Sequence, residues 1–162
     1  MDGKALFIVD VQEGGMTSEL RRLAASIETL QERYCSIFVF RFVNVPASPW
    51  DKWLNWRRFR EDKETALAFK PVQGAYLYDK GTYTCLSPDV LNKLEKDRVS
   101  EVHIAGLRTE NCVLKTAVDL FETNKFRPVI LARYCGSPHR NLHDAALDIL
   151  EKFIGKDQIV YD

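Results

Sequence analysis

The sequence lacks any long apolar run, because no stretch approaches the roughly 20 consecutive apolar residues that a membrane-spanning helix requires. The first residues, Met1 to Lys4, lead straight into a strand-like segment and do not resemble the start of a signal peptide. We therefore expect a cytoplasmic protein with no membrane partner.

An excess of charge is also missing. The chain has 23 lysines and arginines and 23 aspartates and glutamates, so its formal net charge is zero. A balanced charge gives no overall field that would attract nucleic acid. We expect a small-molecule substrate and no nucleic-acid partner, although Arg57, Arg58 and Arg60 stand close together.

Paired cysteines are absent as well. Cys35, Cys85, Cys112 and Cys135 form no CxxC motif, which excludes a zinc knuckle and a thioredoxin-like redox site. In a reducing compartment all four are expected to be free thiols.

What the chain does have is a regular alternation of strands and helices. Apolar, β-branched runs predict six strands, and segments with apolar residues at helical spacing separate most of them. The strand-like runs are 5–10, 36–43, 75–79, 102–106, 128–132 and 158–161; the helical patterns begin at Ser18, Ser87–Pro88, Glu110 and Ser137–Pro138, the last ending near Gly155. We predict one domain, 1–162, with a three-layer α/β/α sandwich and a mainly parallel sheet of about six strands.

The stretch 44–74 departs from this alternation. Long excursions between strands often form a lid or a subunit contact. Trp50, Trp53 and Trp56 lie at i, i+3 and i+6, which is too wide an arc for one helix face. We expect at least one of them at a pocket mouth or a subunit interface, with core packing as the equal alternative, and a homo-oligomer, either a dimer or a tetramer.

Three polar residues stand at the C-terminal ends of predicted strands, where open parallel sheets bind ligands. They are Asp10, Lys80 and Cys112. Cys112 falls in the first turn of a helix, where the helix dipole stabilises a thiolate and free N–H groups can receive an oxyanion. A carboxylate and an ammonium beside it form a coherent nucleophilic device. The simpler interpretation is an ordinary ion pair near a buried thiol.

The segments 7–12, 80–84 and 105–113, in this order, resemble the isochorismatase-like cysteine hydrolases. The resemblance implies that Asp10 is the acid/base, Lys80 the polarising cation and Cys112 the nucleophile. It also implies a cis peptide at Leu107–Arg108, with the N–H groups of Arg108 and Cys112 facing the oxyanion.

The chain departs from this family in several places. Nicotinamidases of the family hold a metal with an Asp-x-His pair and further histidines after the second strand, whereas all three histidines here, His103, His139 and His143, come after residue 102. We expect no metal and no other cofactor, and a structural role for His143. Further pocket residues are expected among Gln12, Trp50, Trp53, Tyr83 and Cys135.

The functional hypothesis is hydrolysis of a C–N bond in a small amide or ureido compound through a Cys112 thioester. Two alternatives stay open. One is vinyl-ether hydrolysis of the isochorismatase kind, and the other is a binding module that keeps the fold without catalysis.

Overall fold

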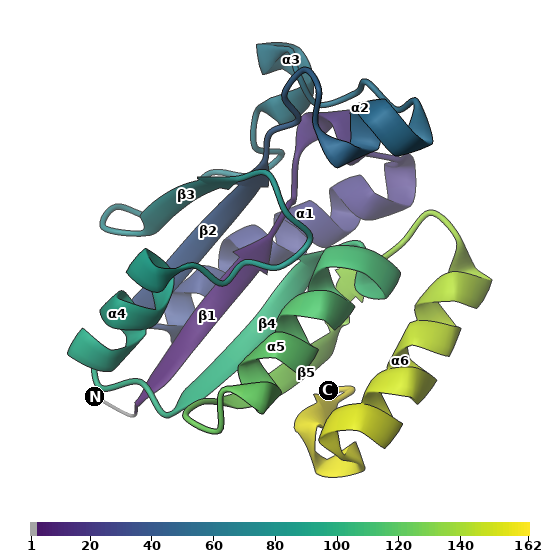
Figure 1. The fold of residues 1–162 in the computed structure, drawn as a ribbon. Coiled ribbons are helices and arrows are strands. Elements are labelled where there is room, and N and C mark those ends of the chain that lie inside the picture. The colour runs from purple at the N-terminus through teal and green to yellow at the C-terminus, as the bar shows by residue number, and fades with distance from the viewer. Residues whose placement is uncertain (1–2) are drawn as a thin grey trace.

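Six parallel strands form the centre of the protein in the computed structural model, which describes residues 3–162. The strands lie in the order β3-β2-β1-β4-β5-β6, and every neighbouring pair is parallel (Figure 1). Their bounds are β1 Lys4–Val9, β2 Ser36–Phe42, β3 Tyr76–Lys80, β4 Glu101–Leu107, β5 Arg127–Gly136 and β6 Ile159–Val160. The predicted parallel α/β architecture is confirmed.

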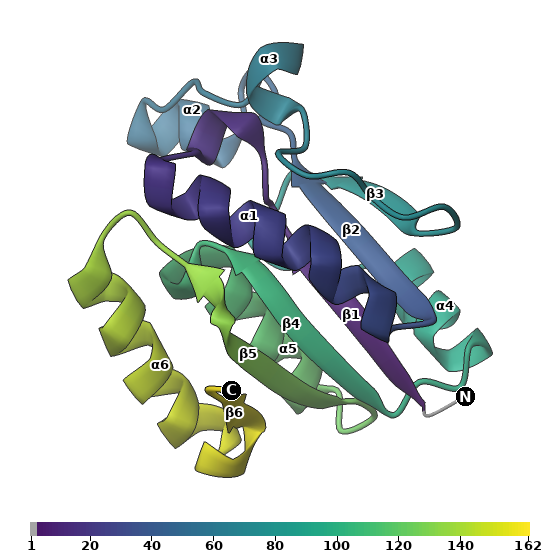
Figure 2. The same ribbon diagram turned by 180° about the vertical axis from the view of Figure 1, so that it is seen from behind.

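Helices cover both faces of this sheet. Helices α4 and α5 pack on one face with α6 beside α5 at the edge, whereas α1 crosses the other face (Figures 1 and 2). The helices are α1 Ser18–Leu30, α2 Pro49–Leu54, α3 Asp62–Thr65, α4 Pro88–Lys96, α5 Leu114–Glu122 and α6 Arg140–Ile154. Within residues 3–162, none of them combines the length and apolar character needed to cross a membrane.

Strand β1 shows why the sheet is covered on both sides. Its residues 5–9 are all fully buried. Phe7 and Val9 belong to the core shared with α4 and α5, and Leu6 and Ile8 to the core shared with α1. A strand that is apolar at every position can be buried only between two layers, which is typical of parallel sheets.

Two helix boundaries differ from the sequence-based expectation. The apolar pattern from Ser18 predicts a helix that ends near Tyr34, but α1 ends at Leu30 and is followed by a short 3-10 turn. Helix α6 begins at Arg140, because the Ser137 hydroxyl accepts a hydrogen bond from the N–H of His139 outside the helix and donates one to Glu110. The predicted end of this helix at Gly155 is confirmed.

Candidate active site

Asp10 and Cys112 lie where the chain leaves the adjacent strands β1 and β4 toward opposite halves of the sheet. Asp10 directly follows β1, and Cys112 lies five residues beyond the end of the neighbouring strand β4. Gly106 makes this close approach feasible, since its φ is +127° and a Cβ there would lie 2.2 Å from the carbonyl oxygen of Val9. In open parallel sheets such a crevice between diverging crossovers is the usual ligand site.

Lys80 connects the three predicted catalytic side chains. Its Nζ donates to Oδ2 of Asp10 at 2.8 Å and lies 3.6 Å from Sγ of Cys112. Two further hydrogen bonds run from Nζ to the carbonyl oxygens of Thr82 and Tyr83, at 2.7 and 3.3 Å. The side chains of Lys80 and Asp10 are only 8% and 9% exposed, so the pair is largely removed from water and held in one geometry.

Burial governs the protonation of this cluster. It raises the pKa of the Asp10 carboxyl, an effect that Lys80 and a hydrogen bond from the Cys112 thiol only partly offset. Burial is the largest single influence and would lower the pKa of Lys80, but the charge of Asp10, the hydrogen bond to it and the nearby Cys85 and Cys112 together raise that pKa, so the ammonium stays charged. The pair therefore combines a permanent cation with a carboxyl whose pKa is shifted toward neutrality.

The expectation of a preformed thiolate at Cys112 is wrong. Burial, followed by the charge of Asp10, raises the pKa of the thiol well above its ordinary value, and Lys80 opposes this only in part. The local backbone also differs from the expected first turn of an α-helix, because residues Thr109–Val113 form a π-helical turn before α5. The resting nucleophile is a neutral thiol beside its base.

The turn that carries Cys112 has the expected backbone feature, a cis peptide between Leu107 and Arg108. The carbonyl oxygen of Arg108 accepts the N–H groups of Asn111 and Val113. A hydrogen bond to α6 also stabilises the turn, because Nδ1 of His143 lies 2.7 Å from the hydroxyl of the buried Thr109. The structural role expected for His143 is consistent with this contact.

A pocket of about 320 Å³ opens above Asp10 and Cys112, and Lys80 lies behind them, outside its lining. Five of its fourteen lining residues are aromatic, and Asp10 and Cys112 also line it. The full lining is Asp10, Gln12, Gly15, Phe42, Trp50, Leu54, Trp56, Arg58, Phe59, Tyr83, Leu107, Arg108, Asn111 and Cys112. The volume is at the small end of ligand pockets, which fits a compact substrate.

Comparison with known proteins gives the family of the chain. The family model described as the isochorismatase domain matches residues 4–156. The chain belongs to the isochorismatase family. This is a family of hydrolases that act on small molecules, so the predicted enzyme class is confirmed. A search of curated protein sequences gave no match.

Solved structures show the fold that this isochorismatase-family chain shares with enzymes. It is similar to a nicotinamidase from Bacillus subtilis, with a TM-score of 0.83 and 22% identity over 99% of each chain. For an isochorismatase-like hydrolase from Alkaliphilus metalliredigens the values are 0.82 and 14%, over 97% of this chain and 93% of that one. For a pyrazinamidase of Pyrococcus horikoshii in complex with zinc they are 0.81 and 18%, over 98% and 97%. At these identities the likeness establishes the fold alone.

The other predicted pocket residues of this family member fall into two groups. Trp50 and Tyr83 line the pocket, with their rings 5.0 Å apart. Gln12 also borders it but is fully buried, and its amide bonds the backbone of Phe42 and Thr65. Its polar atoms are thus engaged in fixing the pocket wall.

Trp53 and Cys135 were expected at the pocket and are not among its lining residues. Trp53 is 79% exposed, because α2 is a single short helix that directs only part of its surface toward the pocket. Cys135 is buried within β5, where its thiol contacts the carbonyl oxygen of Ile104 at 3.6 Å. The pleat of the strand turns this side chain into the core.

Phe42 and Phe59 of the wall were not predicted, whereas Trp56 belongs to the three tryptophans of which at least one was expected at a pocket mouth or a subunit interface. The rings of Trp56 and Phe59 stack at 5.7 Å, and both pack on Phe42. Asn44, also missed, organises them: its buried amide donates to the carbonyl oxygens of Trp56 and Arg58. The only signal was the position of Asn44 and Phe42 at the C-terminal end of a strand.

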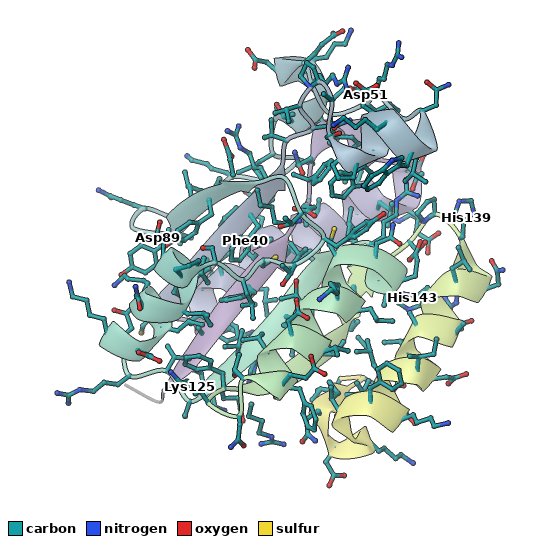
Figure 3. All side chains as sticks on the ribbon, viewed as in Figure 1. Phe40, Asp51, Asp89, Lys125, His139 and His143 are labelled. Carbon is teal, nitrogen blue, oxygen red and sulfur yellow. The ribbon has the colours of Figure 1, made fainter. Side chains whose placement is uncertain are left out.

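These residues do not fit the Asp-x-His and histidine metal site that the family resemblance describes for nicotinamidases. His103 bonds Tyr34 and Glu101, and His139 and His143 belong to the start of α6 (Figure 3), outside the pocket lining. The amide of Asn44 is engaged with backbone and with Ser48. Across residues 3–162, no three His, Cys, Asp or Glu side chains are grouped to hold an ion.

Proposed function

We propose that this protein hydrolyses a C–N bond in a small amide or ureido compound through a thioester on Cys112. The observation that carries the proposal is the position of Lys80, 2.8 Å from the Asp10 carboxylate and 3.6 Å from the Cys112 sulfur. A base, a fixed cation and a nucleophile at hydrogen-bonding range are what covalent acyl transfer requires.

In the first half of the reaction, Asp10 takes the thiol proton while the sulfur attacks the substrate carbonyl carbon. The carbonyl electrons move onto oxygen, and the N–H groups of Arg108 and Cys112 stabilise the resulting oxyanion. The intermediate collapses as the C–N bond breaks, and Asp10 returns its proton to the departing nitrogen. The products of this half are a free amine and an acyl thioester.

In the second half, water occupies the space that the amine has left. Asp10 accepts a proton from the water, whose oxygen attacks the thioester carbonyl. Collapse of the second tetrahedral intermediate breaks the C–S bond, and the proton on Asp10 returns to sulfur. Lys80 keeps its charge throughout, because its pKa is raised by Asp10 despite burial. One water is consumed, and the thiol is regenerated.

The pocket wall favours a flat acyl group. Trp50, Trp56 and Tyr83 present ring surfaces around the space above Cys112, and aromatic faces bind planar conjugated groups well. Arg108 adds a cation to the lining, whereas the guanidinium of Arg58 is already paired with Glu64. The best substrate is therefore a planar amide that carries an acidic group near the carbonyl.

Mass spectrometry of the intact protein tests the chemistry. Mixed with a panel of planar amides, the wild type should gain the mass of an acyl group on Cys112, and Cys112→Ala should lose both adduct and turnover. Cys135→Ala is the matched control, since it removes a buried thiol outside the pocket, and it should retain activity. Turnover by Cys112→Ala would refute the thioester and favour vinyl-ether hydrolysis. Absence of turnover, together with tight binding of unmodified amides, would favour a binding module.

A further inference from the structure

The π-helical turn Thr109–Val113, here called the cysteine turn, begins with a hydroxyl that depends on one partner. Thr109 is fully buried, and within residues 3–162 the only hydrogen bond of its hydroxyl is the 2.7 Å contact with Nδ1 of His143. Thr109 stands between Arg108 and Cys112, the two residues whose N–H groups stabilise the oxyanion in the proposed reaction. A shift of Thr109 therefore moves the backbone that carries both donors.

The ring of His143 is suited to a buried hydroxyl because it is uncharged at neutral pH. Burial lowers the pKa of His143 below its ordinary value, and the charge of Arg140 acts in the same direction. Three carboxylates, those of Asp144, Glu110 and Glu19, oppose this shift only in part. A neutral imidazole has one nitrogen that donates and one that accepts, so Nδ1 and the hydroxyl can pair in either direction.

Packing of α6 fixes the place of this ring. His143, Leu147, Leu150 and Ile154 recur at i, i+4, i+7 and i+11, so they share one face of the helix. The last three are buried in the core. A hydrogen-bonding group on a core-packed helix is held more precisely than one on a loop. Helix α6 thus presents the ring to the cysteine turn in one position.

A second hydrogen bond joins the start of α6 to the next residue of the cysteine turn. The Ser137 hydroxyl donates to Oε1 of Glu110 at 2.8 Å and accepts the N–H of His139, the residue before α6. In the part of the chain that the structure describes, Arg108 precedes the turn without a side-chain cap. The first two residues of the turn are therefore held by α6 and the segment that leads into it.

We propose that His143 is a positioning residue for the oxyanion hole. Through Thr109 it holds the cysteine turn so that the two donor N–H groups converge on the substrate carbonyl oxygen. This inference rests on the proposed thioester function. His143 is not among the residues that line the active-site pocket, so it acts through Thr109 and not by contact with the substrate. Its effect belongs to the steps in which negative charge develops on oxygen.

Two reactions of Cys112 separate this role from a general effect on the structure. In acylation by p-nitrophenyl acetate, sulfur attacks the ester carbonyl, and an oxyanion forms before p-nitrophenolate leaves. In alkylation by iodoacetamide, sulfur displaces iodide at a saturated carbon, and no oxyanion forms. Release of p-nitrophenolate above the rate of Cys112→Ala measures acylation at Cys112, and peptide mass spectrometry measures its alkylation apart from that of the exposed Cys35. A displaced oxyanion hole slows the first reaction alone.

His143→Leu removes the hydrogen bond and keeps the space filled. Leucine is preferable to alanine, because His143 also lines a second cavity of about 550 Å³, from which water could replace a truncated ring. Acylation should fall about tenfold or more, and alkylation should be unchanged. His143→Asn, whose amide oxygen lies near the place of Nδ1, should recover most of the acylation rate. His139→Leu, at the start of the same helix (Figure 3) and without a side-chain cap bond, is the matched control and should alter neither reaction.

Thr109→Val tests the same hydrogen bond from its other partner, and it answers the question even where His143→Leu does not fold by circular dichroism. Its acylation rate should fall as in His143→Leu, and the double variant should lose little more, because both groups act through one contact. Unchanged acylation in either single variant, parallel losses of acylation and alkylation, or His143→Asn no faster than His143→Leu would overturn the positioning role. A wild type that releases p-nitrophenolate no faster than Cys112→Ala would refute the thioester function itself, and this role with it.

Discussion

Replacing Lys80 with methionine should destabilise the fold in a pH-dependent way. The substitution keeps the length of the side chain but leaves the Asp10 carboxylate, 9% exposed, without its counter-ion. Breaking a buried ion pair by removing one partner costs about 3–5 kcal/mol. With a urea m-value of about 2 kcal/mol per molar for a domain of this size, the unfolding midpoint should fall by about 1.5–2.5 M.

The pH dependence follows from the direction of the Asp10 shift. Its pKa is raised in the folded state, and Lys80 is the largest influence that holds it down. Without that charge the folded pKa rises further, so the native state binds more protons than the unfolded state between the ordinary carboxyl pKa and the new one. Stability then falls as pH rises. The deficit of Lys80→Met relative to wild type should be small near pH 4 and largest at neutral pH.

Urea titrations of four proteins at several pH values supply the measurement: wild type, Lys80→Met, Asp10→Asn and the double variant. The double variant carries no buried charge at this position, so it should regain most of the lost stability and lose the pH dependence. A Lys80→Met deficit that is the same at pH 5 and pH 7, or a double variant less stable than Lys80→Met, would show that Lys80 does not act through the Asp10 charge.

Three further predictions follow from the site. Asp10→Asn should speed alkylation of Cys112 by iodoacetamide, because the charge of Asp10 adds to burial in raising the pKa of that thiol. An alkylation rate of Cys112 that the substitution leaves unchanged would contradict this prediction. In the wild type the exposed Cys35 should be labelled first. Activity should survive exhaustive chelation, and a loss reversed only by zinc, iron or manganese would refute the reading of the site. Gly106→Ala should give little folded protein by circular dichroism, since the added Cβ would meet the Val9 carbonyl oxygen at 2.2 Å, and a stable variant would mean that β4 can shift.

The positions of Asp10, Lys80 and Cys112 could be predicted from the sequence because each depends on one strong local pattern. Buried strands are read from apolar runs, and parallel strands bring their C-terminal ends to the same edge of a sheet. The sequence pattern placed Lys80 just after the strand 75–79, whereas in the structure Lys80 is the last residue of β3. It still lies at the same edge of the sheet.

The aromatic wall could not be predicted in this way. Trp56 and Phe59 reach the pocket because the chain turns sharply at Asn55 and Phe59, both with positive φ, at 49° and 61°. Such turns at residues other than glycine leave no periodic trace in the sequence. They are maintained by the buried amide of Asn44, which bonds carbonyl groups 12 and 14 residues away. Such hydrogen bonds form only when the whole 44–74 stretch is folded, so no local pattern in the sequence predicts them.

The protonation state of Cys112 was predicted wrongly because the prediction rested on its position at a helix start. A helix start favours a thiolate by a modest electrostatic effect that acts within one turn, whereas burial beside a carboxylate opposes the charge more strongly and raises the pKa. The neutral thiol has a mechanistic consequence. A preformed thiolate would compete with Asp10 for the charge of Lys80 and leave no thiol proton for Asp10 to deliver to the leaving nitrogen. With a neutral thiol at rest, sulfur becomes nucleophilic only as its proton moves to Asp10. The first step therefore gives Asp10 the proton that it later donates to the leaving nitrogen.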